Sequence, residues 1–231
     1  MMRRMATPRK RRAGVRNGDL TLTDRAYRRL EEMIVTLQLA PGAVVSETAL
    51  SSRLGIGRTP IREALQRLAR ERLIVVLPRR GIMVAEVNIR TQLRLIETRR
   101  EVERLLARLA AKRATDAQRQ RFREIAAGME KAAKANDDVT FMRLDREFNT
   151  LELEAAQNEF AAGAMILMHG LSRRFWYIHY KEVADMPLTA RQHADIAQAI
   201  ADANPRAATE AVDRLMDYIE KFTRATVDAD S

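Results

Sequence analysis

Four polar residues in the second half of the chain interrupt apolar helical stripes, and together they could bind a small ligand. They are Arg99, Asp145, Asn149 and His193, and they come from three different predicted helices. Polar groups that face a protein interior need hydrogen-bonding or charged partners. A few convergent polar side chains in an apolar surrounding are typical of a small-molecule pocket. On this basis we interpret the four residues as a candidate pocket.

Each of these residues also has an ordinary structural alternative. Arg99 could pair with Glu103 one helical turn later, and Asp145 could pair with an arginine of a neighbouring helix. A lone histidine on an apolar face, such as His193, is usually a satisfied core residue. Asp145 and His193 could form an acid–base pair, but no nucleophile motif, phosphate loop or complete metal set accompanies them. We therefore do not expect an enzyme.

A second group of residues could contact a nucleic acid. Arg58 and Arg62 lie one helical turn apart on the basic face of a predicted helix, so both can enter the same groove. A guanidinium pairs bidentately with guanine, and Thr59 can reach a phosphate or a base. A solvated arginine-rich surface is the alternative. The candidate DNA contacts are Arg58, Thr59, Arg62, Gln66, Arg67, Arg79, Arg80 and Gly81.

The elements that must position these arginines form a compact pattern. The predicted helices cover 19–37, 46–54 and 59–71, and the predicted strands cover 73–77 and 82–87. Thr23 or Asp24 is expected to cap the first helix and Thr59 the third. The sequence PRRG joins the two strands in a hairpin. Helix, helix, turn, helix and a two-stranded wing outline a winged helix-turn-helix.

The remainder of the chain has only helical patterns. The six predicted helices lie near 89–113, 116–135, 137–156, 158–181, 188–203 and 205–227. They fit an all-α antiparallel bundle. The fold class is therefore mainly α, with a flexible basic arm at 1–18, a winged helix at 19–87 and a helical domain at 88–228.

One stretch of the fourth of these helices, SRRFWYIHY at 172–180, mixes basic and aromatic residues. Such a mixture could stack on nucleic-acid bases. On a helix, Phe175, Ile178 and Trp176 are better explained as core or dimer-interface residues. The remaining polar residues, Arg173, Arg174 and His179, could line the rim of the pocket or be solvated.

The charge of the chain separates in the same way as its architecture. Residues 1–88 hold 18 Lys and Arg against 8 Asp and Glu, whereas the remaining residues hold 23 of each. A basic excess confined to one compact segment is typical of a polyanion binder. The chain has no cysteine, which suits the cytoplasm, and no apolar run long enough to span a membrane.

The stretch from Ser46 to Val84 resembles the winged helix of the GntR family of bacterial transcription regulators. The RTPIREAL run and the PRRG wing carry the resemblance. It implies that Arg58, Thr59, Arg62 and Gly81 contact DNA. The family commonly has an arginine two residues before Leu50, where this chain has Thr48, so its operator preference could differ.

The second half resembles the all-helical effector domain of the FadR subfamily. RREVE, LDREFN and HADIAQAI carry this resemblance, which implies that Arg99 contacts a ligand. Many members bind a divalent metal through one Asp and three His, and the metal helps to hold a carboxylate. Asp145 and His193 match two ligand positions, but Asn149 and Leu215 replace the other two. No cofactor is therefore expected to be required, and a divalent metal on Asp145, His193 and Asn149 remains the alternative.

Together these features predict a ligand-responsive transcription regulator. It would bind a palindromic double-stranded DNA operator as a homodimer and respond to a small organic acid, without a membrane partner. The alternative is a non-regulatory, architectural DNA-binding protein whose helical half only dimerises.

Overall fold

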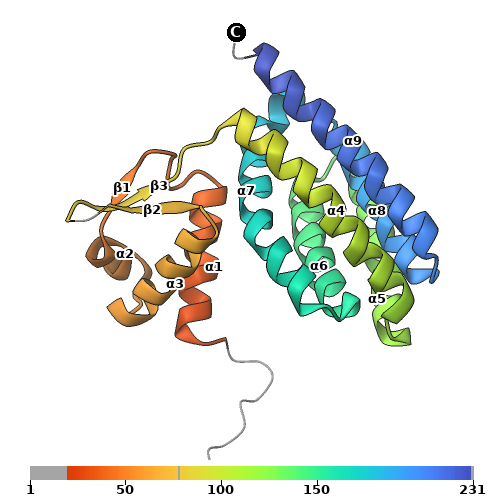
Figure 1. Ribbon diagram of the computed structural model, residues 1–231, viewed down its shortest axis with the longest axis horizontal. Coiled ribbons are helices and arrows are strands. Elements are labelled where there is room, and N and C mark those ends of the chain that lie inside the picture. Colours follow the sequence, from red (N-terminus) through yellow and green to blue (C-terminus); the bar gives the residue numbers. More distant parts are fainter. Residues whose placement is uncertain (1–19, 78, 230–231) are drawn as a thin grey trace, which may run out of the picture.

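The computed structural model describes residues 20–77 and 79–229, so the predicted basic arm at 1–18 lies outside the described residues. A small N-terminal unit of helices and strands lies beside a larger all-helical unit (Figure 1). The fold is mainly α, as the sequence predicts. Among the described helices, none is both long enough and apolar enough to cross a membrane.

Three helices begin the N-terminal unit. They are α1 (Leu22–Val35), α2 (Glu47–Leu54) and α3 (Arg58–Arg70). The cap of α1 is Thr21, whose hydroxyl accepts a hydrogen bond from the Asp24 backbone N–H, so the predicted caps Thr23 and Asp24 are wrong. The predicted cap Thr59 is also wrong, because α3 begins directly after Gly57 and no described side chain caps it. Thr59 therefore already lies inside the first turn.

The core of this unit forms where α3 meets α1 and the sheet. The predicted inward face of α3 is confirmed, since Ile61, Ala64, Leu65 and Leu68 are all buried. They pack in one cluster with apolar residues of α1 and the strands. The basic face of α3 is thereby fixed toward the outside.

The wing has one strand more than the sequence predicts. Strands β1 (Val44–Val45), β2 (Ile74–Leu77) and β3 (Gly81–Val84) form an antiparallel sheet in the order β1-β3-β2. The predicted hairpin is β2–β3, in which Leu77 pairs with Gly81. Gly81 has a φ of 105°, and a Cβ there would lie 2.8 Å from the backbone oxygen of Val45. Glycine is therefore required where β1 meets the wing.

Six helices form the second unit, at nearly the predicted positions. They are α4 (Ile89–Arg113), α5 (Asp116–Ala135), α6 (Asp138–Ala156), α7 (Glu159–Val183), α8 (Met186–Ala201) and α9 (Pro205–Ala229). The side chains of Asn88, Thr115, Asp137, Asn158 and Asp185 accept hydrogen bonds from backbone N–H groups at the starts of α4 to α8. These caps explain why the sequence located the helix starts well.

Helix α7 lies against the N-terminal unit and alongside α1 (Figure 1). A Cβ added to Gly170 would lie 2.7 Å from Cδ1 of Leu73, a fully buried residue that precedes β2. The absence of a side chain at Gly170 thus allows the close approach of the two units.

Two consecutive arginines of α7 also connect the units. Nη1 of Arg173 donates a hydrogen bond of 2.6 Å to Oε1 of Glu31 on α1. Nη1 and Nη2 of Arg174 donate to the backbone oxygens of Ala85 and Glu86, at 2.8 and 3.3 Å. One arginine therefore holds α1, and the other holds the connection between β3 and α4.

Candidate functional site

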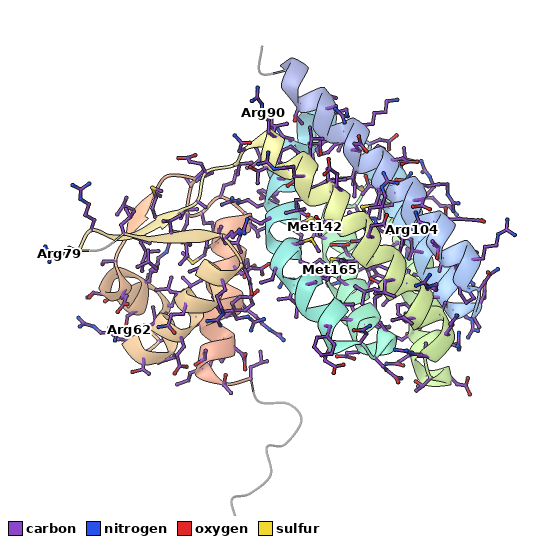
Figure 2. The ribbon with its side chains drawn as sticks, in the orientation of Figure 1. Arg62, Arg79, Arg90, Arg104, Met142 and Met165 are labelled. Carbon is purple, nitrogen blue, oxygen red and sulfur yellow. The ribbon has the colours of Figure 1, made fainter. Side chains whose placement is uncertain are left out.

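The outer face of α3 is the first candidate site. Arg58, Thr59, Arg62 and Gln66 are exposed there, opposite the buried face of the helix. Arg62 points away from the helical domain, and so does Arg79 on the wing (Figure 2). The structure therefore places the predicted contacts of α3 and the wing on the outward side of the N-terminal unit.

Arg62 is held in place by a carboxylate of the preceding helix. Its Nη2 lies 2.8 Å from Oε2 of Glu47, and its Nε lies 3.1 Å from Oε1 of Glu47. These hydrogen bonds hold the pKa of the Glu47 carboxyl below its usual range. Because the Arg62 side chain is still 62% exposed, its guanidinium remains available to a partner. The pair thus orients Arg62 without covering it.

Arg67 occupies a different position from the other predicted contacts. Its guanidinium carbon lies 3.6 Å from the ring centroid of Tyr27, and its Nε donates to Oε1 of Glu71 at 3.2 Å. The guanidinium of Arg67 thus contacts Tyr27 of α1 and Glu71 at the end of α3. Arg67 is therefore not part of the proposed DNA-contact surface.

The tip of the wing supplies further positive charge. Arg79 and Arg80 are exposed, and Arg79 adopts a left-handed φ of 63° in the turn between β2 and β3. Two unshielded cations at a tip suit phosphates or a minor groove. Together with α3, they form a basic surface that can bind a polyanion.

The second candidate site is a cavity inside the helical domain. The structure brings all four predicted residues, Arg99, Asp145, Asn149 and His193, to its wall. Its volume is about 60 Å³, and the wall also carries apolar side chains from α6, α7 and α9. Such a cavity holds a few water molecules or a small ligand.

Asp145, Asn149 and His193 form one group of polar contacts. Nδ1 of His193 lies 2.8 Å from the backbone oxygen of Thr189, and Nε2 lies 3.4 Å from Oδ1 of Asp145. The amide nitrogen of Asn149 donates to the same Oδ1 at 3.0 Å. The expected alternative of an arginine partner for Asp145 is not seen among the described residues. Instead, the imidazole of His193 and the amide of Asn149 lie beside the Asp145 carboxylate.

Arg99 does pair with Glu103, as its structural alternative predicts. The two side chains are buried, and Nη2 of Arg99 lies 2.6 Å from Oε1 of Glu103. Glu152 lies close to this pair and is also buried. Burial, followed by the charge of Glu103, raises the pKa of Glu152 well above its usual range. Burial therefore favours the neutral form of Glu152, and Glu103 is the carboxylate that pairs with Arg99.

Three further pocket residues on α7 were not singled out as candidates from the sequence. Nε2 of His169, Oγ of Ser172 and Nε1 of Trp176 line the cavity or its edge, are buried, and have no hydrogen-bond partner within the described part of the chain. Burial, followed by the positive charge of Arg99, lowers the pKa of His169 to about 3. This histidine is therefore neutral. A buried polar atom without a partner costs about 1–3 kcal/mol.

The donor set of the cavity does not fit a transition metal. Asn149 directs its amide nitrogen, which is not a metal ligand, at Asp145. Leu215 is 1% exposed and lies in the apolar core. Within the described ranges, no group of three His, Cys, Asp or Glu side chains is placed to hold a metal ion. Two ligands and an amide make a poor site for Zn²⁺.

Comparison with known proteins assigns each of the two units to a family. Residues 22–84 match the model of the bacterial regulatory proteins of the gntR family, and residues 94–218 match that of the FCD domain. The chain is 27% identical over 206 residues to the HTH-type transcriptional repressor RspR of Escherichia coli, covering 87% of this chain and 90% of that protein. It is also 27% identical over 170 residues to the Nta operon transcriptional regulator of Aminobacter aminovorans, covering 74% of this chain and 79% of the relative.

Solved structures show the same fold. The chain resembles McbR/YncC of E. coli with a TM-score of 0.73 and 19% identity, over 90% of this chain and all of that one (100%). A GntR regulator from Rhodococcus sp. RHA1 gives a TM-score of 0.63 at 18% identity, over 88% and 97% of the two chains. The two family models together cover both units of the structure, and the FCD match alone spans more than half of the chain. The chain therefore belongs to the GntR family of bacterial transcription regulators that carry an FCD domain.

Proposed function

We propose that this regulator binds a palindromic operator as a homodimer, and that a small carboxylate-bearing metabolite controls this binding. The metabolite would occupy the cavity lined by Arg99, Asp145, Asn149 and His193, which we call the FCD cavity. DNA binding follows from the family, whereas the operator symmetry, the dimer and the ligand class are our inferences. An operator on DNA also implies a cytoplasmic protein.

The basic surface supports the DNA half of the proposal. Arg58, Thr59 and Arg62 would read bases in the major groove, while Arg79 and Arg80 would contact phosphates beside it. One winged helix covers only a half-site. Two-fold symmetry is the ordinary way in which such a protein reaches specific affinity, and a palindromic operator matches that symmetry.

The ligand half rests on one observation, the unpartnered polar atoms on the wall of the cavity. Carboxylate oxygens could accept hydrogen bonds from Ser172 and Trp176 and from a neutral, N–H-bearing His169. Arg99 and Arg173 are the cations of the cavity wall; each also pairs with a carboxylate behind the wall, Glu103 and Glu31 respectively. Because the cavity is small, we expect an acid of few atoms, or one whose entry moves the Met142 side chain on the wall.

Trp176 gives a direct test of the ligand, because it is the single tryptophan of the chain and lines the cavity. Titration with small carboxylic acids, with and without a chelator, should change its fluorescence at a defined Kd. A response that disappears with chelator would contradict the metal-free pocket. A lack of response to every acid would contradict the carboxylate class.

Selection of bound fragments from the source genome tests the DNA half. We expect inverted repeats, and light scattering should give the mass of a dimer. Binding that is insensitive to sequence at equal salt would instead favour the architectural alternative. Removing one positive charge of α3 with Arg62→Ala should weaken operator binding more than non-specific binding.

A further inference from the structure

Arg173 lies on the walls of two neighbouring cavities. One is the FCD cavity just described, and the other is a crevice between α7 and the winged helix. Arg99 belongs only to the first wall, whereas Glu31 and Arg67 belong only to the second. A charged side chain shared by both cavities can respond to a ligand in one and act on the other.

On the side of the crevice, Arg173 neutralises a carboxylate that has little access to water. The Glu31 side chain is 11% exposed, and its Oε1 lies 2.6 Å from Nη1 of Arg173. The other nearby cation is Arg146, at 4.0 Å. A buried carboxylate that loses its close cation must regain either water or another partner. Arg173 is therefore the cation that lies nearer to Glu31, and its removal would leave the carboxylate with the more distant Arg146.

Arg173 also lines the FCD cavity, and Glu31 accepts from only one nitrogen of its guanidinium. The described residues supply no hydrogen-bond acceptor for its Nε and Nη2. The neighbouring polar groups, Ser172 and His169, also lack a partner for one atom each. An anion in the cavity would lie among Arg173, Ser172 and His169, and it would attract the same guanidinium that pairs with Glu31.

From these contacts we infer that Arg173 is a latch: a carboxylate in the FCD cavity draws its guanidinium away from Glu31, and α1 then separates from α7. The inference rests on the proposed function, because it uses the same cavity and ligand class. It adds the residue through which the ligand would act on DNA binding.

The path from α1 to the DNA-contact face is short. Tyr27 of α1 lies under the guanidinium of Arg67 on α3, and its hydroxyl donates to Glu71 at 2.8 Å. Because α1 and α3 share the core of the winged helix, a shift of α1 carries α3 with it. The ligand would thus change the orientation of the whole winged helix relative to the FCD domain.

Hydrogen exchange in the full-length protein tests the latch without any ligand. Glu31→Gln and Arg173→Gln should each speed exchange in α1 by about five- to tenfold, with exchange in α5 unchanged. Glu32→Gln is the matched control, because Glu32 lies on the same helix and pairs only at the surface with Arg29. Its exchange should equal that of the wild type. Equal rates in all four proteins would overturn the latch.

Binding of acetate, succinate and citrate, followed by Trp176 fluorescence, tests the competition. Glu31→Gln should bind the responding acid about five- to tenfold more tightly than the wild type, and Arg173→Gln more weakly by a similar factor. Equal affinity in the wild type and Glu31→Gln would overturn the competition. If no acid binds either protein, the carboxylate class and the competition are both rejected. The exchange rates then still decide whether Arg173 and Glu31 hold the winged helix.

Discussion

The amide nitrogen of Asn149 donates a hydrogen bond of 3.0 Å to Oδ1 of Asp145, the same oxygen that faces Nε2 of His193. Asn149 stands where the resemblance to the FadR subfamily would place a histidine ligand, and its amide donates a hydrogen bond to the Asp145 carboxylate. Asp145 is oriented by this amide and by the imidazole. Asp145 and His193, which match two metal-ligand positions of the FadR subfamily, thus lie 3.4 Å apart, and Asn149 donates a hydrogen bond to the carboxylate.

Restoring the two missing histidines should therefore create metal binding. We expect Asn149→His/Leu215→His to be less stable than the wild type without metal, because Leu215 is 1% exposed in the core. Zn²⁺ at about 100 times Kd should stabilise this variant by about 2.7 kcal/mol. Calorimetric melting with and without Zn²⁺ is the measurement. An equal rise in Tm for the wild type would show that its own side chains already hold the metal.

Arg62 and Arg79 should contribute differently to DNA binding. Arg62→Ala should cost about 1–3 kcal/mol on the preferred operator and relax the preference at one base pair. Arg79→Ala should weaken binding to all sequences alike and reduce the salt slope by about one. Fluorescence anisotropy with specific and scrambled DNA, over a series of salt concentrations, separates the two effects. Identical effects on both DNAs for Arg62→Ala would remove it from base recognition.

Glu47 should improve specificity while reducing total affinity. Its carboxylate orients Arg62 but also adds negative charge near the phosphates. We expect Glu47→Gln to bind scrambled DNA more tightly and to discriminate the operator less, by about three- to tenfold in the ratio of the two Kd values. The same anisotropy titrations measure this ratio. A variant that discriminates as well as the wild type would show that Arg62 needs no such support.

Two glycines of α7 should respond oppositely to substitution by alanine. Gly170→Ala should lower the free energy of unfolding by about 1–3 kcal/mol, since the new Cβ would meet the buried Leu73. Gly163→Ala should raise it by about 0.5–1 kcal/mol, because nothing lies within 4 Å of the added atom and alanine favours the helix. Urea denaturation of both variants provides the comparison. A stabilised Gly170→Ala variant would mean that the two units separate easily there.

His169 should make the protein less stable in acid. Its pKa is about 3 in the folded chain, against 6.5 as the ordinary value. Below pH 6.5 the unfolded chain therefore binds a proton that the folded chain does not. The free energy of unfolding should fall by about 1.4 kcal/mol per pH unit from this group as the pH falls toward 3. In His169→Gln, the slope of the free energy of unfolding against pH should be smaller by the amount that corresponds to one proton. Urea denaturation between pH 7 and pH 4 measures this slope.

The helices could be predicted from the sequence because local signals mark them. Asn88, Thr115 and Asn158 cap helices through their own side chains, and apolar periodicity fills the segments between caps. Strand β1 was missed because two residues, Val44 and Val45, carry no alternation. Their strand exists only through pairing with β3, which is distant in the sequence.

The candidate pocket was predicted in part for the same reason. Arg99, Asp145, Asn149 and His193 interrupt clear apolar stripes, so they were found, although their roles in binding stay predictions. His169 and Ser172 lie on a helix that is apolar on several faces, where no stripe shows which polar residue points inward. The pairing of Arg173 with Glu31 spans 142 positions and has no local signal at all.

The hydrogen bonds from Arg174 to the backbone oxygens of Ala85 and Glu86 fix one point of contact between the winged helix and the FCD domain. Only two residues separate these anchored carbonyls from the start of α4, and two residues reach at most about 7 Å. These hydrogen bonds and the short connection limit sliding of the winged helix along the FCD domain, whereas a swing about this point would leave them in place. The arc of such a swing grows with distance from this point, so a small opening at Glu31 becomes a larger displacement at the far tip of the wing. In a dimer, this leverage would change the spacing of the two half-sites rather than the chemistry of either one.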